Sequence, residues 1–267
     1  MILIRSSRVR GLLLGLAVLA GCSTKQVNPA TLTPDDLYQR ADSAYVTRKF
    51  DRAIPLLEAF VQQHGGDERA PEAQMMLARA HFEKRDYITA ASEYQRLVES
   101  YPNSPLNLDA RFAICESYLE LSPKPTLDQE YTRAALGHCQ SIVTSFPGTP
   151  QAEKAAQVVT DLNEKLAQKL YDTAAFYSKR RAYDAAIVYY TEVISTYPQT
   201  TLAPKALQKL METYGILGYV EEAQQSRARL VAEYPNSAEA RGLPPVPAPA
   251  DSASADTTTS DSARIGG

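Results

Sequence analysis

The stretch METYGILGYVEEAQQSRARLVAEYP, residues 211–235, carries the pattern that decides the fold. Apolar residues recur at helical spacing in two segments, and the segments are separated by a short break between Tyr214 and Tyr219. Ala223 follows Tyr219 by one helical turn, and Tyr234-Pro235 ends the second segment. Proline ends a helix because it lacks an amide donor and biases its predecessor away from helical angles. The stretch therefore predicts two antiparallel helices joined by a tight turn.

The same unit occurs five times along the chain. An aromatic residue followed by proline also closes earlier copies at 101–102, 146–147 and 197–198, whereas the first copy ends at His64-Gly65. The second segments open with an aromatic and a small residue at Phe50 and Ala53, Tyr87 and Ala90, Tyr131 and Ala134, and Tyr183 and Ala186. The first segments end in the aromatics Tyr45, Phe82, Tyr118, Tyr177 and Tyr214. A repeat of this period predicts an array of helical hairpins.

This spacing resembles the tetratricopeptide repeat, which has small residues where its two helices touch. No β-alternating run is long enough to predict a strand. We therefore expect an all-α protein, a superhelical array of five tetratricopeptide-like hairpins, that is, an α-solenoid. The alternative is a set of unrelated amphipathic helices. The small residues expected to face each other are Ala41, Ala78, Cys115 and Ala174 on first helices and Ala53, Ala90, Ala134 and Ala186 on second helices.

The third hairpin is interrupted by SPKPTLDQEYT, residues 122–132, where the other hairpins have a tight turn. Pro123 and Pro125 restrict the freedom of this insertion. Asp128 and Thr132 are expected to cap the helix that resumes after it. The sequence therefore predicts an ordered loop within the third hairpin.

The first 21 residues read as a lipoprotein signal peptide. Three arginines precede an apolar run that is too short to anchor in a bilayer. The run ends in Leu-Ala-Gly before Cys22, which matches the bacterial lipobox and predicts lipidation of Cys22, including an amide-linked acyl chain such as palmitate. The alternative is a plain signal peptide with a chance cysteine. Ser23, rather than aspartate, favours sorting to the outer membrane.

The repeats divide the rest of the chain. A flexible tether is expected at 22–33, a repeat domain at 34–241, and a disordered tail rich in Pro, Ala, Ser and Asp at 242–267. The repeats lie near 35–67, 71–104, 108–149, 166–200 and 203–237. The whole chain has a formal charge of −3, and loss of the signal's three arginines leaves −6. This balance, without a basic patch, argues against nucleic acid as a partner.

The sequence offers no recognisable catalytic constellation, and we expect neither an enzyme nor a cofactor. Cys115 and Cys139 lie on the two helices of the third hairpin, but Cys139 is five residues beyond Ala134. That offset, about 7.5 Å along a helix, favours buried free thiols over a disulfide. His138 has too few neighbouring ligands to predict a metal site. An enzyme that uses Cys115 and His138 is kept as an alternative.

An array of hairpins presents a concave surface lined by its first helices. Aromatic, methionine and charged side chains are suited to binding an extended apolar peptide. The alternative is that several of them pack against the neighbouring repeat. The residues expected to face inward in the first two repeats are Tyr38, Asp42, Tyr45, Met75, Arg79 and Phe82.

The lipobox, the insertion and the segment FYSKRRAYDAAI at 176–187 together resemble the BamD family of outer membrane protein assembly lipoproteins. The resemblance covers nearly the whole mature chain. It implies a periplasmic scaffold, lipid-anchored in the outer membrane, that binds the central barrel component and other assembly lipoproteins. It also implies that the N-terminal repeats receive unfolded outer membrane proteins. On the fourth and fifth repeats, it points to Arg180, Arg181 and Tyr189 as exposed partner-binding candidates.

A second reading remains open. Lipidation and repeats also fit a periplasmic adaptor for cell-envelope or cell-division proteins that act on peptidoglycan. The two readings differ in what they predict should co-purify, because only the assembly factor should bring a large barrel with it.

Overall fold

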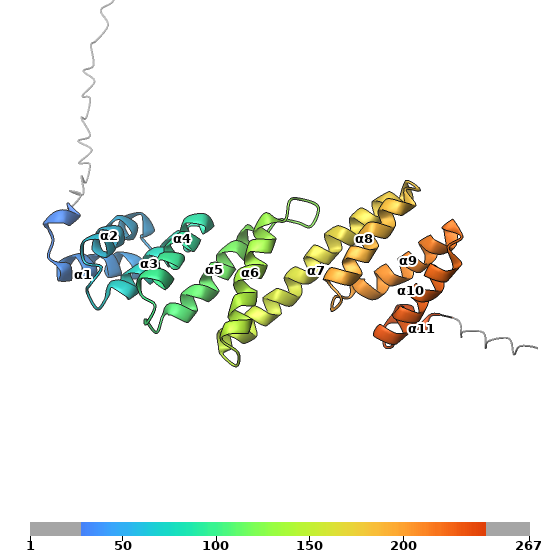
Figure 1. Cartoon of the computed structure of the whole chain (residues 1–267). Coiled ribbons are helices and arrows are strands. Elements are labelled where there is room, and N and C mark those ends of the chain that lie inside the picture. The colour runs from blue at the N-terminus through green and yellow to red at the C-terminus, as the bar shows by residue number, and fades with distance from the viewer. Residues whose placement is uncertain (1–27, 244–267) are drawn as a thin grey trace, which may run out of the picture.

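The computed structural model describes residues 28–243, and all regular structure in that range is helical. The helices follow one another as antiparallel neighbours in an elongated array (Figure 1). The predicted all-α hairpin array is therefore confirmed. Within this range no helix is both long enough and apolar enough to cross a membrane. Cys22, the signal peptide and nearly all of the predicted tail lie outside the described residues.

Five hairpins form the array, preceded by a short 3-10 turn, η1 (Pro29–Thr31). They are α1 (Pro34–Val46) with α2 (Phe50–Gln63), α3 (Ala70–Glu83) with α4 (Tyr87–Ser100), α5 (Asn107–Leu121) with α6 (Glu130–Ser145), α7 (Pro150–Lys179) with α8 (Tyr183–Thr196), and α9 (Leu202–Leu217) with α10 (Val220–Glu233). A last turn, α11 (Ala238–Arg241), packs on α9 and α10. Leu32, within the predicted tether, packs against the core of the first hairpin.

Four hairpins close with the same tight turn. In the first, Lys49 N–H donates to the carbonyl of Ala44 at 2.8 Å, a bond that spans the end of the helix. The residue before each such donor is left-handed: Arg48, Arg85, Arg181 and Gly218. Glycine or asparagine is usual there because the left-handed region crowds Cβ. Three arginines in this position are therefore unusual.

Small residues hold the paired helices close, as the sequence predicts. Ala41 and Ala53 are fully buried in one core cluster, and Ala78 and Ala90 are buried in the next. Ala174 and Ala186 do the same in the fourth hairpin. Larger side chains at these points would push the helices apart, since protein interiors are close-packed.

The third hairpin departs from the expected register. The buried residues of α6 are Thr132, Ala135, Cys139 and Ile142, so the small contact residue is Ala135 rather than Ala134. Cys139 lies seven residues after Thr132, as Tyr94 lies seven after Tyr87 and Tyr190 seven after Tyr183. It therefore takes the inward position that these two tyrosines hold in other hairpins. It forms a disulfide with Cys115, with 5.4 Å between the Cα atoms. The expectation of free thiols was wrong because Cys115 lies opposite Cys139 itself, and not opposite Ala134 as the predicted pairing of the two helices had it.

The fourth hairpin begins earlier than expected. Its first helix, α7, starts at Pro150 with Thr149 as its N-cap and runs without a break to Lys179. The repeat was placed near residue 166, about halfway along this helix. The first half of α7 packs on α6, and the second half pairs with α8. One helix therefore joins the third hairpin to the fourth (Figure 1).

The insertion is held by a chain of polar contacts. Gln129 is fully buried, and its Nε2 donates to the carbonyls of Lys124 and Leu127 at 2.8 and 3.0 Å. Its Oε1 accepts from the Thr132 hydroxyl at 2.7 Å. Asp128 lies one residue before the N-cap of α6, which is Gln129, and accepts from Glu130 N–H at 2.8 Å. The loop is ordered as predicted, but neither Asp128 nor Thr132 is the N-cap, and Thr132 is a buried link.

Two lysines of α7 fix the other side of the loop. Lys165 Nζ donates to the carbonyl and hydroxyl oxygens of Ser122 at 3.1 and 2.7 Å, and burial lowers the pKa of this lysine. Lys169 Nζ donates to the carbonyl of Leu127 at 2.5 Å. The long helix α7 thus positions the insertion as well as the fourth hairpin.

Candidate binding surfaces

The first-helix aromatics lie beside the turn of each hairpin. Tyr45 is half-buried, with its ring 6.0 Å from Phe50, and Phe82 lies edge-on to Tyr87 at 5.1 Å. Asp42 is also half-buried, one turn before Tyr45. Tyr45 and Phe82 each keep one part accessible while the partner ring fixes their position. They provide pre-set apolar edges for a ligand, which limits the loss of side-chain freedom on binding.

Tyr38 belongs to a tight cluster between the first and second hairpins. Its ring lies 5.3 Å from Phe60, and the Arg69 guanidinium sits 5.0 Å from its centroid. Its hydroxyl donates to Glu72 at 2.9 Å. Burial, followed by the hydrogen bond to Glu72, raises the pKa of Tyr38 to about 12. Its main contacts therefore join two hairpins.

Met75 is not available to a ligand. It is only 3% exposed and lies in the core cluster with Tyr94 of its own hairpin and Ile114 of α5 in the next hairpin. Met75 therefore packs against the neighbouring repeat, which is the alternative to a place in the groove. Met75 therefore contributes to stability and leaves the candidate groove.

Charged residues of three first helices lie within electrostatic range of one another, and sequence reasoning missed two of them. Arg79 on α3 is exposed, and Glu116 follows on α5. Burial raises the pKa of Glu116, while Lys154 on α7 and Arg79 act in the opposite direction. Lys154 also lies 5.9 Å from the Phe112 ring. Cation, carboxylate and cation thus alternate along the first-helix face.

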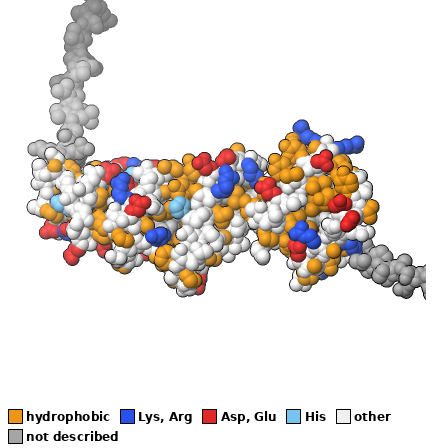
Figure 2. All heavy atoms as spheres, in the orientation of Figure 1, with side chains coloured by type: hydrophobic (Ala, Val, Ile, Leu, Met, Phe, Trp, Pro, Cys, Tyr) orange, Lys and Arg blue, Asp and Glu red, His pale blue; other side chains and the backbone are white. Residues whose placement is uncertain are grey.

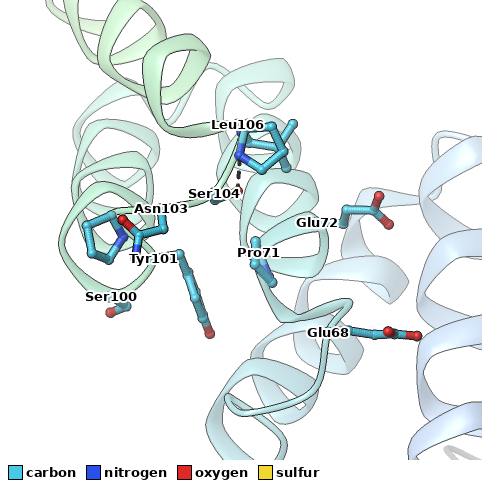
Figure 3. A pocket seen from close by; sticks show the side chains of 10 residues that line it. Glu68, Pro71, Glu72, Ser100, Tyr101, Asn103, Ser104 and Leu106 are labelled. Carbon is cyan, nitrogen blue, oxygen red and sulfur yellow. Dashed lines mark hydrogen bonds between the residues drawn. The ribbon is translucent and has the colours of Figure 1, made fainter.

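A separate shallow pocket of about 410 Å³ lies between the connections α2–α3 and α4–α5 (Figure 3). Glu68 and Glu72 line one side of it, and Tyr101 and Leu106 line the other. The Tyr101 hydroxyl donates to the carbonyl of Gly65 at 3.1 Å, which ties the two connections together. Nowhere in residues 28–243 do three metal-ligating side chains gather. The pocket is open and acidic, and it is distinct from the aromatic groove.

The partner-binding candidates occupy the α7–α8 turn. Arg180 is exposed and lies 4.4 Å from the Phe176 ring, which is itself 49% exposed. Arg181 is the left-handed turn residue. Basic side chains project from the upper edge in Figure 2, where Figure 1 draws this turn. Tyr189 is half-buried and stacks on Tyr177 at 5.5 Å, so it is less exposed than expected.

An enzyme that uses Cys115 and His138, the alternative kept above, would lack a free thiol as its nucleophile. Cys115 is fully buried and disulfide-bonded, so it offers no thiolate. The His138 ring stacks on Tyr118 at 5.2 Å with 3° between the planes, and burial lowers the His138 pKa. These residues form a packed contact in the third hairpin.

Known proteins similar to this chain agree on one family. The YfiO family, described as outer membrane lipoprotein, matches residues 30–230. The outer membrane protein assembly factor BamD of Rickettsia prowazekii is 30% identical over 230 residues, covering 85% of this chain and 90% of that protein. BamD of Caulobacter vibrioides is 26% identical, covering 82% and 73%, and BamD of Vibrio cholerae is 25% identical, covering 80% and 93%.

Among solved structures, the TPR2AB domain of yeast Sti1, in a complex with pHSP90, is 18% identical with a TM-score of 0.42. It covers 78% of this chain and 80% of its own chain, and a likeness at that level adds nothing about function. The family match spans most of the described hairpins, and the relatives align over most of their length. The chain belongs to the outer membrane lipoprotein family that contains the assembly factor BamD.

Proposed function

We propose that this protein is an outer membrane protein assembly factor, a non-enzymatic scaffold that brings unfolded substrates to a larger complex. The observation that carries the proposal is membership of a family whose relatives have that name. Those relatives align with this chain over most of their length. An array of hairpins suits the role because it presents a long surface to which extended segments can bind.

The N-terminal hairpins would receive the substrate. An unfolded barrel strand has apolar side chains on alternate positions, and Tyr45 and Phe82 offer apolar edges on successive first helices. Arg79, Glu116 and Lys154 lie on the same face and can pair with polar groups of an extended chain. Ordering an unfolded segment has an entropic cost, so the affinity should be modest. A modest affinity allows release.

The C-terminal hairpins would bind the central barrel component of the complex through its periplasmic domains. The α7–α8 turn offers Arg180 beside the exposed ring of Phe176, and the α9–α10 turn adds the exposed side chain of Ile216. Aromatic residues and arginine in an apolar centre contribute most of the binding energy in many protein interfaces. Tyr189 would support this surface from beneath, through its stack with Tyr177.

The chain would be held at the periplasmic face of the outer membrane by lipid on Cys22, beside other assembly lipoproteins. The supporting observation is the lipobox that ends at Cys22. Two or more acyl chains on one residue give stable anchoring, whereas one is marginal. The array would then stay close to the membrane into which its substrates insert.

The proposal is tested by purifying the tagged lipoprotein from its native membrane in mild detergent and identifying its partners by mass spectrometry. We expect near-stoichiometric recovery of a large outer membrane barrel that bears periplasmic domains. Phe176→Ala with Arg180→Glu should abolish that recovery. The matched control is Val231→Ala with Lys205→Glu. It changes an exposed apolar residue near the end of α10 and a basic residue near the start of α9, both far from the α9–α10 turn, and should leave recovery intact. Recovery of cell-wall or division proteins alone would overturn the proposal.

A further inference from the structure

The turns of the first three hairpins repeat one surface pattern. Each exposes one large aliphatic side chain with one basic side chain three residues away along the chain. The aliphatic residues are 69%, 46% and 58% exposed. The pairs are Val46 with Lys49, Ile88 with Arg85, and Leu127 with Lys124, and together they are called the turn strip here.

The turn strip is continuous along the N-terminal half of the array. Arg48 of the first turn pairs with Glu83 beside the second, and Lys84 pairs with Asp51 at 2.6 Å in the reverse direction. Tyr87, at the start of α4, lies close enough to Glu120 near the end of α5 that this carboxylate adds to the effect of burial in raising the pKa of Tyr87. These contacts place the three turns side by side on one edge.

The cations of the turn strip are free to meet an external partner. Lys49, Arg85 and Lys124 have no ion pair within the described part of the chain. Four acidic residues at these turns are already engaged, whereas Glu130 at the start of α6 is exposed and has no ion pair within the described residues. Asp51 and Glu83 hold Lys84 and Arg48, Asp86 contacts His81, and Asp128 accepts from Glu130 N–H and lies 3.9 Å from Arg133.

The backbone at Leu127, the third apolar member, is fixed, because its carbonyl accepts from both Lys169 and the buried Gln129. Among residues 28–243, eight of the ten exposed large hydrophobic side chains lie within four residues of a hairpin turn. The two exceptions are Val188 and Val231. Within the described hairpins, the edge that carries the connections between them has no comparable row of exposed large hydrophobic side chains.

We propose that the turn strip lies on the surface of a bilayer and binds anionic phospholipid headgroups. Single aliphatic side chains spaced along an edge, each beside a cation, suit a headgroup layer, where apolar tips enter the interface and cations meet phosphates. A stable protein interface instead needs a contiguous apolar centre. The strip goes beyond the proposed function and does not depend on the partner surface of the α7–α8 and α9–α10 turns.

Chain length agrees with this placement. Six residues, 22–27, lead from the predicted lipid on Cys22 to the start of the described chain at residue 28. Fully extended, they span at most about 22 Å. The first hairpin is therefore kept near any membrane that holds the lipid, and headgroup contacts by the strip would orient the array.

The absence of tryptophan from this chain gives a direct test. Val46→Trp and Leu127→Trp each place a single tryptophan on the strip, and Val231→Trp places one on the opposite edge at 46% exposure. The full mature chain with Cys22→Ser is mixed with vesicles of phosphatidylethanolamine and phosphatidylglycerol. We expect a blue shift in fluorescence from both strip tryptophans, none from the control, and loss of the shift at high salt or with phosphatidylcholine vesicles. An unshifted strip, or an equal shift in the control, would overturn the proposal.

A charge variant separates lipid from protein as the occupant. Lys49→Gln with Arg85→Asn removes two free cations, and asparagine tolerates the left-handed angle at position 85. Vesicle binding should weaken on the order of tenfold. Arg96→Gln with Lys205→Gln removes two cations elsewhere and should have little effect. If the strip variant bound vesicles normally but lost the barrel partner in the detergent purification, the strip would be a protein surface and the proposal would be wrong.

Discussion

Cys115 on α5 and Cys139 on α6 are joined by a disulfide, with their Cα atoms 5.4 Å apart. Both are fully buried, and together they tie the two helices that flank the insertion. A hairpin with a tight turn aligns its helices through the turn itself. The third hairpin has a long loop instead, and the covalent bond restricts the register that the loop leaves free.

The disulfide should contribute substantially to stability. It joins residues 24 apart, and closing a loop of that length stabilises a fold by about 3 kcal/mol in the chain-entropy view. Cys115→Ala with Cys139→Ala should lower the free energy of unfolding by that order, measured by urea denaturation without reductant. Dithiothreitol should destabilise the natural chain and leave the double variant unchanged. Equal stability of the two chains under oxidising conditions would contradict the bond.

Gln129 should determine the order of the insertion. Gln129→Ala removes three hydrogen bonds, so the buried Thr132 hydroxyl and the carbonyls of Lys124 and Leu127 each lose one of two partners. The expected loss is about 1–3 kcal/mol, with faster amide exchange at residues 122–129. The exposed Asp128, just before the N-cap, makes a single hydrogen bond to Glu130 N–H, so Asp128→Ala should cost only about 1 kcal/mol. Comparable exchange in the two variants would show that Gln129 does not organise the loop.

Substitutions in the second hairpin should affect either stability or peptide binding, depending on whether the residue lies in the core or in the groove. Met75→Ala should reduce the free energy of unfolding by about 2–5 kcal/mol, because the side chain is buried in the core. Phe82→Ala with Arg79→Ala should instead weaken binding of an unfolded barrel peptide, measured by fluorescence anisotropy, with a smaller effect on stability. A groove variant that kept full peptide affinity would remove these residues from the proposed substrate site.

The hairpin array followed from the sequence because small and aromatic residues mark the helix contacts directly. Ala53, Ala90 and Ala186 are buried as expected. The third hairpin was misread by one residue, because Tyr131 imitates the aromatic opener, although Thr132 holds that position in the structure. A period-based reading could not show α7 continuing through residues 150–165, where no aromatic marker occurs.

The candidate surfaces were harder to predict than the helices. Met75 and Arg79 lie four residues apart on α3, yet one is buried and the other exposed, because the neighbouring hairpin covers only part of that face. The proximity of Glu116 to Lys154 depends on how α5 packs against α7. Such contacts depend on the angle between successive hairpins, which spacing within one repeat does not encode.

Sorting of the lipoprotein should depend on the residue after Cys22. Ser23→Asp should retain a fraction of the protein in the inner membrane, because aspartate at this position opposes export in the usual bacterial rule. Membrane fractionation on a sucrose gradient measures the distribution, and Ser23→Ala is the matched control. An unchanged outer membrane fraction for the aspartate variant would show that another signal sorts this chain.

Buried tyrosines should make the fold sensitive to alkaline pH. Burial raises the pKa of Tyr190 to about 12, and Tyr171 and Glu212 add to the effect. A tyrosine in the unfolded chain titrates near pH 10. Because the folded pKa is the higher one, the stabilising contribution is complete below pH 10 and is lost as pH rises through 12. Urea denaturation between pH 9 and 12 should therefore show falling stability, and Tyr190→Phe should flatten part of that fall. A variant with the same pH dependence as the natural chain would show that ionisation of Tyr190 is not coupled to unfolding.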